Sequence, residues 1–342
     1  MNRDRNDRIH TMTATFGTID PARRVLVIFP GALGDFVCAM PAIEAIAGRH
    51  RGASIELMAR PELARLAVGT TSVARGHSID APHVSRLFSE SGAEDPDTRE
   101  FFSSYERIYS FFASNDARFR NALAAATGGE VSFHPFRPVD NFPSEPHIAA
   151  AYLRSIGAAD APMRARIEPN RDDLRAASDA IASLGCDASN LVAIFPGSGS
   201  PAKNWPLDKF ATVARTLSDR ASVVFILGPA ESAIEQRLRE SDLPVLKDLD
   251  LGTVAGIARL ASGFVGNDSG VSHLAAASDA PGVVIFGPTD PARWRPIGRI
   301  VVLGPREIDT IGVGEVAAAF AQICSGRDSA ARKEYRVEKG VP

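Results

Sequence analysis

The sequence has few cysteines and no strong charge of either sign. Its 342 residues include three cysteines and carry a formal net charge of −3. The cysteines lie far apart and form no CxxC pair, which argues against a disulfide framework and a zinc site and indicates a reducing compartment. A weakly negative chain has no general electrostatic attraction to nucleic acid, so no nucleic-acid partner is expected.

Long apolar runs are also missing. No uninterrupted apolar run is long enough to span a bilayer, and residues 1–24 are polar, with several arginines and no stretch of signal-peptide length. We therefore expect no transmembrane segment and a cytoplasmic location. The segment after Ser325 is mixed in charge and poor in aliphatic residues, which predicts a solvated tail. A peripheral contact of this tail with an anionic membrane surface is the open alternative.

What the sequence does contain is a repeated alternation of buried strands and helices. Aliphatic and β-branched runs predict strands at 23–29, 53–59, 105–113, 190–197, 221–228, 262–267 and 282–287. Helical patterns lie between them, at 39–48, 61–69, 115–129, 146–157 and 205–217. This order predicts an α/β protein with parallel sheets and right-handed crossovers.

The alternation of strands and helices begins again in the middle of the chain, which favours two domains. We expect doubly wound domains with a linker and two terminal segments: a flexible extension at 1–22, domains at 23–160 and 176–325, a linker at 161–175 and a tail at 326–342. A Phe-Pro-Gly triplet ends the first strand of each half, at 29–31 and 195–197. Two such domains side by side would face a central cleft with the carboxyl ends of both sheets, where ligands bind.

Three loops after buried strands carry the candidate chemistry. In the first, "GALGDF", Asp35 lies where the loop enters a helix. As a helix cap it would accept a backbone N–H; as a general base it would face the cleft. Both interpretations stay open on the sequence.

The second and third loops predict anion binding. "GSGSPAKNWP" offers Ser198, Gly199 and Lys203 before a helix with Pro206 in its first turn, but it lacks the spacing of a Walker A loop. "GNDSGVSH" places Asp268 and Ser269 before a helix that begins near Gly270, with His273 in its first turns. Free N–H groups at such helix ends favour phosphate or another anion. A mobile loop with a solvated lysine, and a packed histidine, are the alternative interpretations.

Taken together, these loops resemble glycosyltransferase family 9, the bacterial heptosyltransferases. The residues that carry the resemblance are "VLVIFPGALGDFVCAMPAIEAI", "IFPGSGSPAKNWPLDKFATVA" and "FVGNDSGVSHLAAASDAPGVVIFGPTDPARW". The resemblance implies a GT-B fold, in which two Rossmann-like domains face a central cleft. It implies that the N-terminal domain binds the acceptor and the C-terminal domain binds the nucleotide sugar.

The resemblance also implies roles for individual residues. Asp35 matches the proposed catalytic base. The residues that match the donor diphosphate loops are Ser198, Gly199, Lys203, Ser269 and Gly270, and those for the donor sugar and nucleotide are Glu231, Asp268 and His273. The acceptor side matches poorly, and its candidates are Arg60, Arg118, Arg120 and His147. Residues 77–105 fit no pattern of the family.

The implied reaction is an inverting, metal-independent transfer of a sugar, with ADP-heptose as the expected donor and a lipopolysaccharide core or related glycan as the acceptor. No cofactor or metal site is expected beyond the nucleotide sugar, and the acceptor would lie at the inner-membrane surface. Two alternatives remain. One is a transferase with another nucleotide sugar and a protein or small-glycan acceptor, and the other is a non-catalytic nucleotide-sugar-binding relative. No GxGxxG follows the first strand, which disfavours a Rossmann oxidoreductase.

Overall fold

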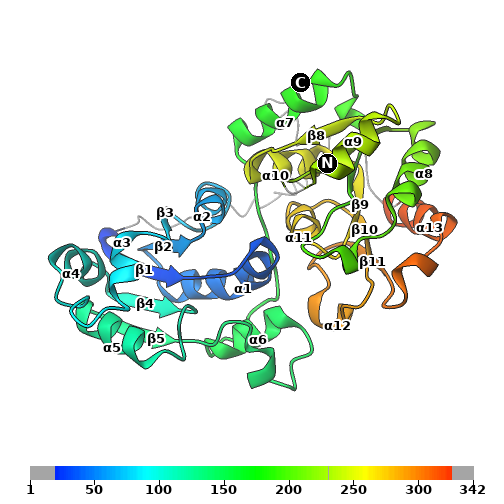
Figure 1. The fold of residues 1–342 in the computed structure, drawn as a ribbon. Helices are drawn as coiled ribbons and strands as arrows, with labels where there is room; N and C mark the ends of the chain where they lie inside the picture. The colour runs from blue at the N-terminus through cyan, green and yellow to red at the C-terminus, as the bar shows by residue number, and fades with distance from the viewer. Residues whose placement is uncertain (1–19, 230, 326–342) are drawn as a thin grey trace, which may run out of the picture.

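The computed structural model describes residues 20–229 and 231–325, which form two α/β domains (Figure 1). The N-terminal sheet has the order β3-β2-β1-β4-β5 and the C-terminal sheet has the order β11-β10-β9-β6-β7-β8. All strand pairs described in both sheets are parallel, as the sequence predicts.

The strands of the N-terminal sheet are β1 (Asp20–Ile28), β2 (Ala53–Ala59), β3 (Arg75–Ser78), β4 (Arg107–Ser110) and β5 (Glu130–Phe133). Those of the C-terminal sheet are β6 (Leu191–Phe195), β7 (Ser222–Leu227), β8 (Val245–Lys247), β9 (Gly263–Asn267), β10 (Gly282–Ile285) and β11 (Ile300–Leu303). The first sheet carries α1 (Leu33–Arg49), α2 (Pro61–Ala67), α3 (Pro82–Arg86), α4 (Pro96–Ser103), α5 (Ala117–Ala126) and α6 (Ile148–Ser155). The second carries α7 (Arg171–Ser183), α8 (Leu207–Ser218), α9 (Ser232–Arg239), α10 (Leu251–Leu260), α11 (Gly270–Ala277), α12 (Pro291–Trp294) and α13 (Val313–Cys324).

Each sheet is wound in both directions from a central pair of strands. The chain leaves β1 toward β2 and β3 and later returns to β4 on the other side of β1; in the second sheet β6 and β9 form the equivalent pair. Ligands of doubly wound sheets bind at the carboxyl end of such a switch point. The loops that carry Asp35, Lys203 and Asp268 follow β1, β6 and β9, so the topology brings all three to these positions.

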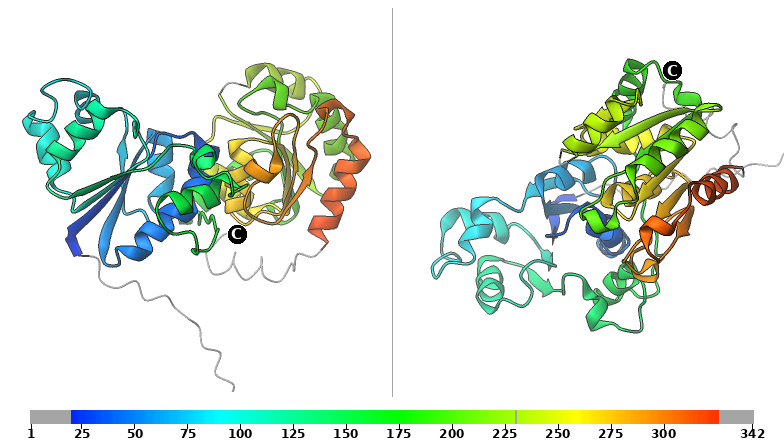
Figure 2. Two further views of the ribbon diagram at one scale, coloured as in Figure 1. Left: turned by 90° about the horizontal axis from the view of Figure 1, so that it is seen from below. Right: turned by 45° about the vertical axis from the view of Figure 1, so that its right-hand side comes forward.

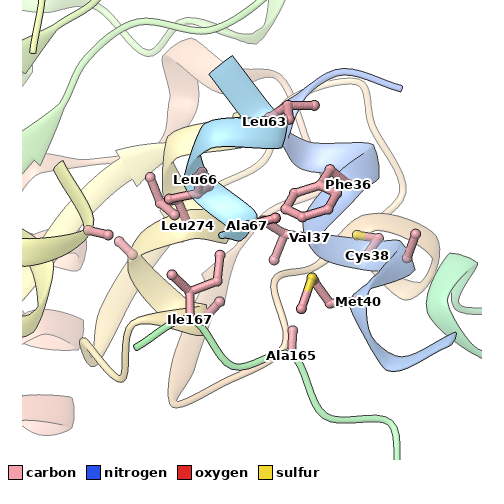
Figure 3. Packing of buried hydrophobic residues seen from close by; sticks show 14 of the residues in the cluster. Phe36, Val37, Cys38, Met40, Leu63, Leu66, Ala67, Ala165, Ile167 and Leu274 are labelled. Atoms are coloured by element: carbon pink, nitrogen blue, oxygen red, sulfur yellow. The ribbon is translucent and has the colours of Figure 1, made fainter. Parts of the chain in front are cut away.

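An apolar interface joins the two domains, which lie side by side in both views of Figure 2. In Figure 3, Val37 of α1 and Leu66 of α2 lie near Leu274 of α11 and near Ile167 of the connecting segment. All four side chains belong to one buried cluster that runs through both domains. The Ile167 N–H also donates to the Ala277 carbonyl at 2.9 Å. A continuous apolar contact of this kind restrains motion between domains.

The sequence missed short elements more than long ones. The strands that it did not predict are β3, β5, β8 and β11, each of three or four residues. Residues 77–105, which fitted no pattern, contain α3 and α4. Alternation of only three or four residues is too short to give a periodic signal. Pro206, expected in the first turn of its helix, is the N-cap of α8.

The expected domain boundaries shift at both ends of the N-terminal domain. β1 begins at Asp20, inside the extension expected at 1–22, and α7 begins at Arg171, inside the expected linker. Because α7 packs on α10, it belongs with the C-terminal domain. Residues 1–19 and the expected tail at 326–342 lie outside the described residues. Within residues 20–229 and 231–325, no helix combines the length and apolar character needed to cross a membrane.

A buried charged cluster stabilises the N-terminal sheet. The Glu56 carboxylate on β2 is fully buried and accepts two hydrogen bonds from the Arg24 guanidinium, both at 2.9 Å. Tyr105 donates to it at 2.8 Å, and the His77 ring nitrogen lies 2.7 Å from it. Burial alone would raise the pKa of Glu56, but the hydrogen bonds from His77, Arg24 and Tyr105 outweigh burial and lower the pKa to about 2.

We predict that Glu56→Gln lowers the free energy of unfolding at neutral pH by about 2–4 kcal/mol, since removing one member of a buried ion pair strands the other. A carboxyl whose pKa falls on folding contributes stability above its unfolded pKa, and that contribution is lost as pH falls through the folded pKa. The gap between variant and wild type should therefore narrow as pH falls from about 4.3 toward about 2. Denaturant unfolding at several pH values measures this difference in unfolding free energy between the variant and the wild type. An equal difference in unfolding free energy at pH 7 and pH 3 would contradict the lowered pKa of Glu56.

Candidate active site

A cavity of about 760 Å³ lies where the two domains meet. Its walls come from the start of α1 and Arg137 in the N-terminal domain, and from the loops after β6, β9 and β10 in the C-terminal domain. Of the residues predicted from the sequence, it gathers Asp35, Gly199, Lys203, Asp268, Ser269, Gly270 and His273. Residues far apart in the sequence thus share one cavity.

Two helix N-termini meet at this cavity. Gly34 lies in the first turn of α1 and Gly270 begins α11, and both line the cavity. A Cβ atom added to Gly270 would lie 3.0 Å from the backbone nitrogen of Gly34, a tighter contact than most Cβ atoms make, so the two helix starts approach each other closely. Each helix end presents free N–H groups and the positive end of its dipole, and two converging ends make a site for an anion.

Asp35 is the third residue of α1, and its side chain is 6% exposed. The N-cap of α1 is Ala32, so the expectation that Asp35 itself is the cap is corrected: Asp35 accepts the Ala32 N–H from within the helix, at 3.3 Å to Oδ2. The carboxylate also lines the cavity. Asp35 therefore supports the helix start from the third helical position, not as the cap, and the same carboxylate faces the cavity.

Arg137 forms a bidentate ion pair with the Asp35 carboxylate. The sequence did not point to Arg137 as a site residue. The Arg137 Nε lies 2.8 Å from Asp35 Oδ1 and its Nη2 lies 2.9 Å from Oδ2. The guanidinium also lies over the rings of Phe136 and of Trp294, with 5.2 Å and 5.7 Å to the ring centres. Trp294 belongs to α12 of the other domain, so Arg137 spans the cavity. No local pattern marks Arg137, because its partners are distant in sequence.

Lys203 and Asp268 form an ion pair at the C-terminal side of the cavity. The Lys203 Nζ lies 2.7 Å from Asp268 Oδ2; Asp268 is 6% exposed, whereas about a third of the Lys203 side chain is accessible. Asn267, fully buried, positions both loops: it accepts the Trp205 N–H at 3.0 Å and donates to the Pro196 carbonyl at 2.7 Å. The lysine is therefore held in place while part of its side chain stays accessible.

His273 is packed between the domains. Its Nδ1 lies 3.5 Å from the Cys38 Sγ of α1, and the side chain is 4% exposed. Burial lowers the pKa of His273 to about 4, so the ring is neutral at pH 7. Burial also raises the pKa of the Cys38 thiol. The pair is a neutral thiol–imidazole contact across the interface, although His273 reaches the cavity wall.

Two donor-side candidates do not line the cavity. The Ser198 hydroxyl donates to the Ser200 carbonyl at 2.7 Å and so shapes its own loop. Glu231 is the N-cap of α9 and accepts the Gly228 N–H at 3.0 Å; burial raises its pKa. Its carboxylate lies against Gly197, where an added Cβ would be 1.3 Å from Oε1. Glu231 is thus beside the loop after β6, and its contact with a nucleotide stays a prediction.

None of the four acceptor candidates lines the cavity. Arg60 is the N-cap of α2, and Arg118 and Arg120 are exposed on α5. His147 is the buried N-cap of α6; it accepts the Ala149 N–H and donates to the Arg295 carbonyl at 2.9 Å. His147 therefore connects the two domains. The roles of all four in acceptor binding stay predictions.

The arrangement can bind an anion and accept a proton in the same cavity. The helix ends and Lys203 supply the positive potential, and Asp35 supplies the carboxylate. Among the residues that the structure describes, no group of three or more His, Cys, Asp or Glu side chains is placed to hold a metal ion.

Comparisons with known proteins show which proteins this chain is similar to. The model of glycosyltransferase family 9 (heptosyltransferase) matches residues 147–304. Lipopolysaccharide heptosyltransferase 2 of Escherichia coli (strain K12) is 26% identical over 304 residues, which are 78% of this chain and 84% of that protein.

The chain is thus similar to the heptosyltransferases of glycosyltransferase family 9. A further relative, lipooligosaccharide heptosyltransferase 2 of Haemophilus influenzae, is 28% identical over 31% of this chain and 34% of that protein. The alignments with the first three curated relatives span between 34% and 44% of those proteins.

Solved structures confirm the GT-B fold with two Rossmann-like domains. A family 9 glycosyltransferase from Veillonella parvula has a TM-score of 0.75 at 18% identity and covers 91% of this chain and 100% of its own. The E. coli ADP-heptose heptosyltransferase II has a TM-score of 0.70 at 19% identity, and the match covers 88% of this chain and 98% of that protein.

We predict that Gly270→Ala lowers the free energy of unfolding by about 1–3 kcal/mol, because the new methyl group would push against the backbone of α1 and force the helices apart. Gly314→Ala in α13 is the matched control: an added Cβ meets no atom within 4 Å there. Alanine is the better helix former by about 1 kcal/mol, so the control should be neutral or stabilising. Thermal unfolding of the Gly270→Ala and Gly314→Ala variants measures this difference in stability. Equal stability of the two would show that the helix ends do not require this close approach.

Proposed function

We propose that this chain transfers a heptose from ADP-heptose to a lipopolysaccharide core or a related glycan, with inversion at the anomeric carbon and without a metal ion or further cofactor. The observation that carries the proposal is that Asp35, Lys203 and two helix N-termini line one cavity between the carboxyl ends of two doubly wound sheets. The family and the heptosyltransferase relatives support the same reaction class. The location at the cytoplasmic face of a membrane stays a prediction.

In the proposed mechanism, Asp35 is the base. A carboxylate has about four lone-pair positions. Three are occupied here: Oδ1 accepts from Arg137, and Oδ2 accepts from both Arg137 and Ala32. Oδ1 therefore keeps one position free for the acceptor hydroxyl. As that hydroxyl oxygen attacks the anomeric carbon, its proton passes to Asp35, and the bond from this carbon to the diphosphate oxygen breaks on the opposite face.

The leaving diphosphate gathers negative charge, and the C-terminal side of the cavity can stabilise it. Lys203 offers an ammonium group, while α1 and α11 present their N-termini. Such preorganised donors act on charge that develops in the transition state. Asp268 holds Lys203 in place and leaves part of it accessible, so Asp268 is a positioning residue in this mechanism.

A split between donor binding and turnover tests the proposal. Lys203→Ala should weaken ADP-heptose binding by at least about tenfold, because one charge-assisted contact contributes about 1.5–3 kcal/mol. Asp35→Asn should bind ADP-heptose normally, but its turnover should fall by about 10²-fold or more, because the amide cannot take the proton. Calorimetry and product formation on a lipopolysaccharide-core acceptor measure the two effects.

Lys247→Ala is the matched lysine control, since Lys247 pairs with Glu235 and does not line the cavity. It should leave binding and turnover unchanged. Normal turnover of Asp35→Asn would remove the base from the mechanism. A parallel thermal-shift screen with ADP-, GDP-, UDP- and CDP-sugars tests the alternative donors, and a selective shift with a donor other than an ADP-sugar would contradict ADP-heptose.

A further inference from the structure

A second cavity, of about 740 Å³, lies in the N-terminal domain. Its lining comes from the chain after β1, at Pro30, after β4, at 111–116, and after β5, at 135–137. β1 and β4 form the switch point of this sheet. The cavity therefore occupies the position where doubly wound sheets bind their ligands, and we call it the N-terminal groove.

The N-terminal groove adjoins the proposed base. Arg137 lines both this groove and the cavity between the domains, and it holds the Asp35 carboxylate at 2.8 and 2.9 Å. A molecule in the groove would thus reach Arg137, the ion-pair partner of Asp35. Asp35 is the group that an acceptor hydroxyl must reach in the proposed function.

The groove offers no unpaired positive charge. Its one basic lining residue, Arg137, is already paired with Asp35, and its other charged lining residues are the acidic Asp116 and Asp140. The nearest arginines of α5 are turned to other partners: Arg118 donates to the Phe88 carbonyl, and Arg120 lies over the Phe133 ring. Asp140 itself lies 4.0 Å from the Arg293 guanidinium of α12. Among the described residues, a phosphate or carboxylate in this groove would therefore meet two carboxylates and only cations that already have a carboxylate partner. Like charges placed together are strongly unfavourable.

The remaining lining suits a sugar ring. Phe112 and Phe136 supply apolar surface, and Phe136 is one of the few large apolar side chains that stay exposed in the described chain. Asn115 and Asn141 are exposed lining residues whose amides can donate and accept. Apolar walls with a few polar groups are typical of small-molecule sites.

We propose that the N-terminal groove binds the acceptor as an uncharged, hydroxyl-rich saccharide, and that it discriminates against a phosphorylated or carboxylated sugar at the position that receives the new bond. The inference rests on the proposed function and specifies the chemistry of its acceptor. Phe136 packs on the apolar face of the sugar, while Asp140 and the two asparagines contact its hydroxyls. Parts of the acceptor outside the groove are not restricted by this chemistry.

Two soluble probes that differ by a single phosphate test the proposal: methyl heptoside and its phosphate monoester, titrated into the full chain with ADP present and followed by NMR. The uncharged probe should bind at least about tenfold more tightly. Phe136→Ala should weaken its binding by a similar factor, whereas Met163→Ala, an exposed apolar residue outside the groove, should not. Asp140→Lys should narrow or reverse the preference, which a purely structural role of Asp140 would not do.

Equal or tighter binding of the monoester, or no binding of either probe, would overturn the inference. The same samples are titrated with ADP-heptose, so the two proposals can fail separately. ADP-heptose that binds without a preference between the probes refutes only the groove chemistry. If ADP-heptose does not bind, the proposed function fails. The preference between the two probes still shows what the groove accepts, because NMR measures probe binding without turnover.

Discussion

The ion pair between Asp35 and Arg137 is the contact on which the site depends. It joins the first turn of α1 to the segment after β5, and the guanidinium lies over Trp294 of the opposite domain. It occupies part of the carboxylate and leaves one position on Oδ1 for a proton. Because Arg137 also lines both cavities, the pair lies where an acceptor and a donor would meet in the proposed reaction.

In this structure the two domains already bring the base and the donor loops to one cavity. Nucleotide-sugar enzymes of two domains invite the expectation that closure brings base and donor loops together. Here the buried cluster is continuous across the interface, and Cys38, His273 and His147 add contacts between the domains. Base and donor loops already line one cavity. Preorganised charges of this kind need no rearrangement when the transition state forms.

The features that could be predicted from the sequence are those that depend on local residue patterns. Long aliphatic strands, the Gly-containing loops after them and the helix start near Gly270 follow from composition and periodicity, and they bring Asp35, Lys203 and Asp268 to the cavity. The helix expected at 39–48 begins earlier, at Leu33. Contacts between distant segments were not predictable. Arg137 lies 102 positions from Asp35, and Cys38 lies 235 positions from His273. The acceptor candidates do not line this cavity, and a lone arginine or histidine in a sequence carries no signal of where its helix packs.

A double-mutant cycle on kcat tests the central claim most directly, with ADP-heptose, a core saccharide acceptor and the variants Asp35→Asn, Arg137→Gln and both together. If Arg137 acts by holding Asp35, its replacement should lower kcat by about tenfold or more in the wild-type background and cause little further loss once Asp35 is changed. Donor affinity should stay the same throughout. Losses that multiply independently, or no loss with Arg137→Gln, would contradict the account.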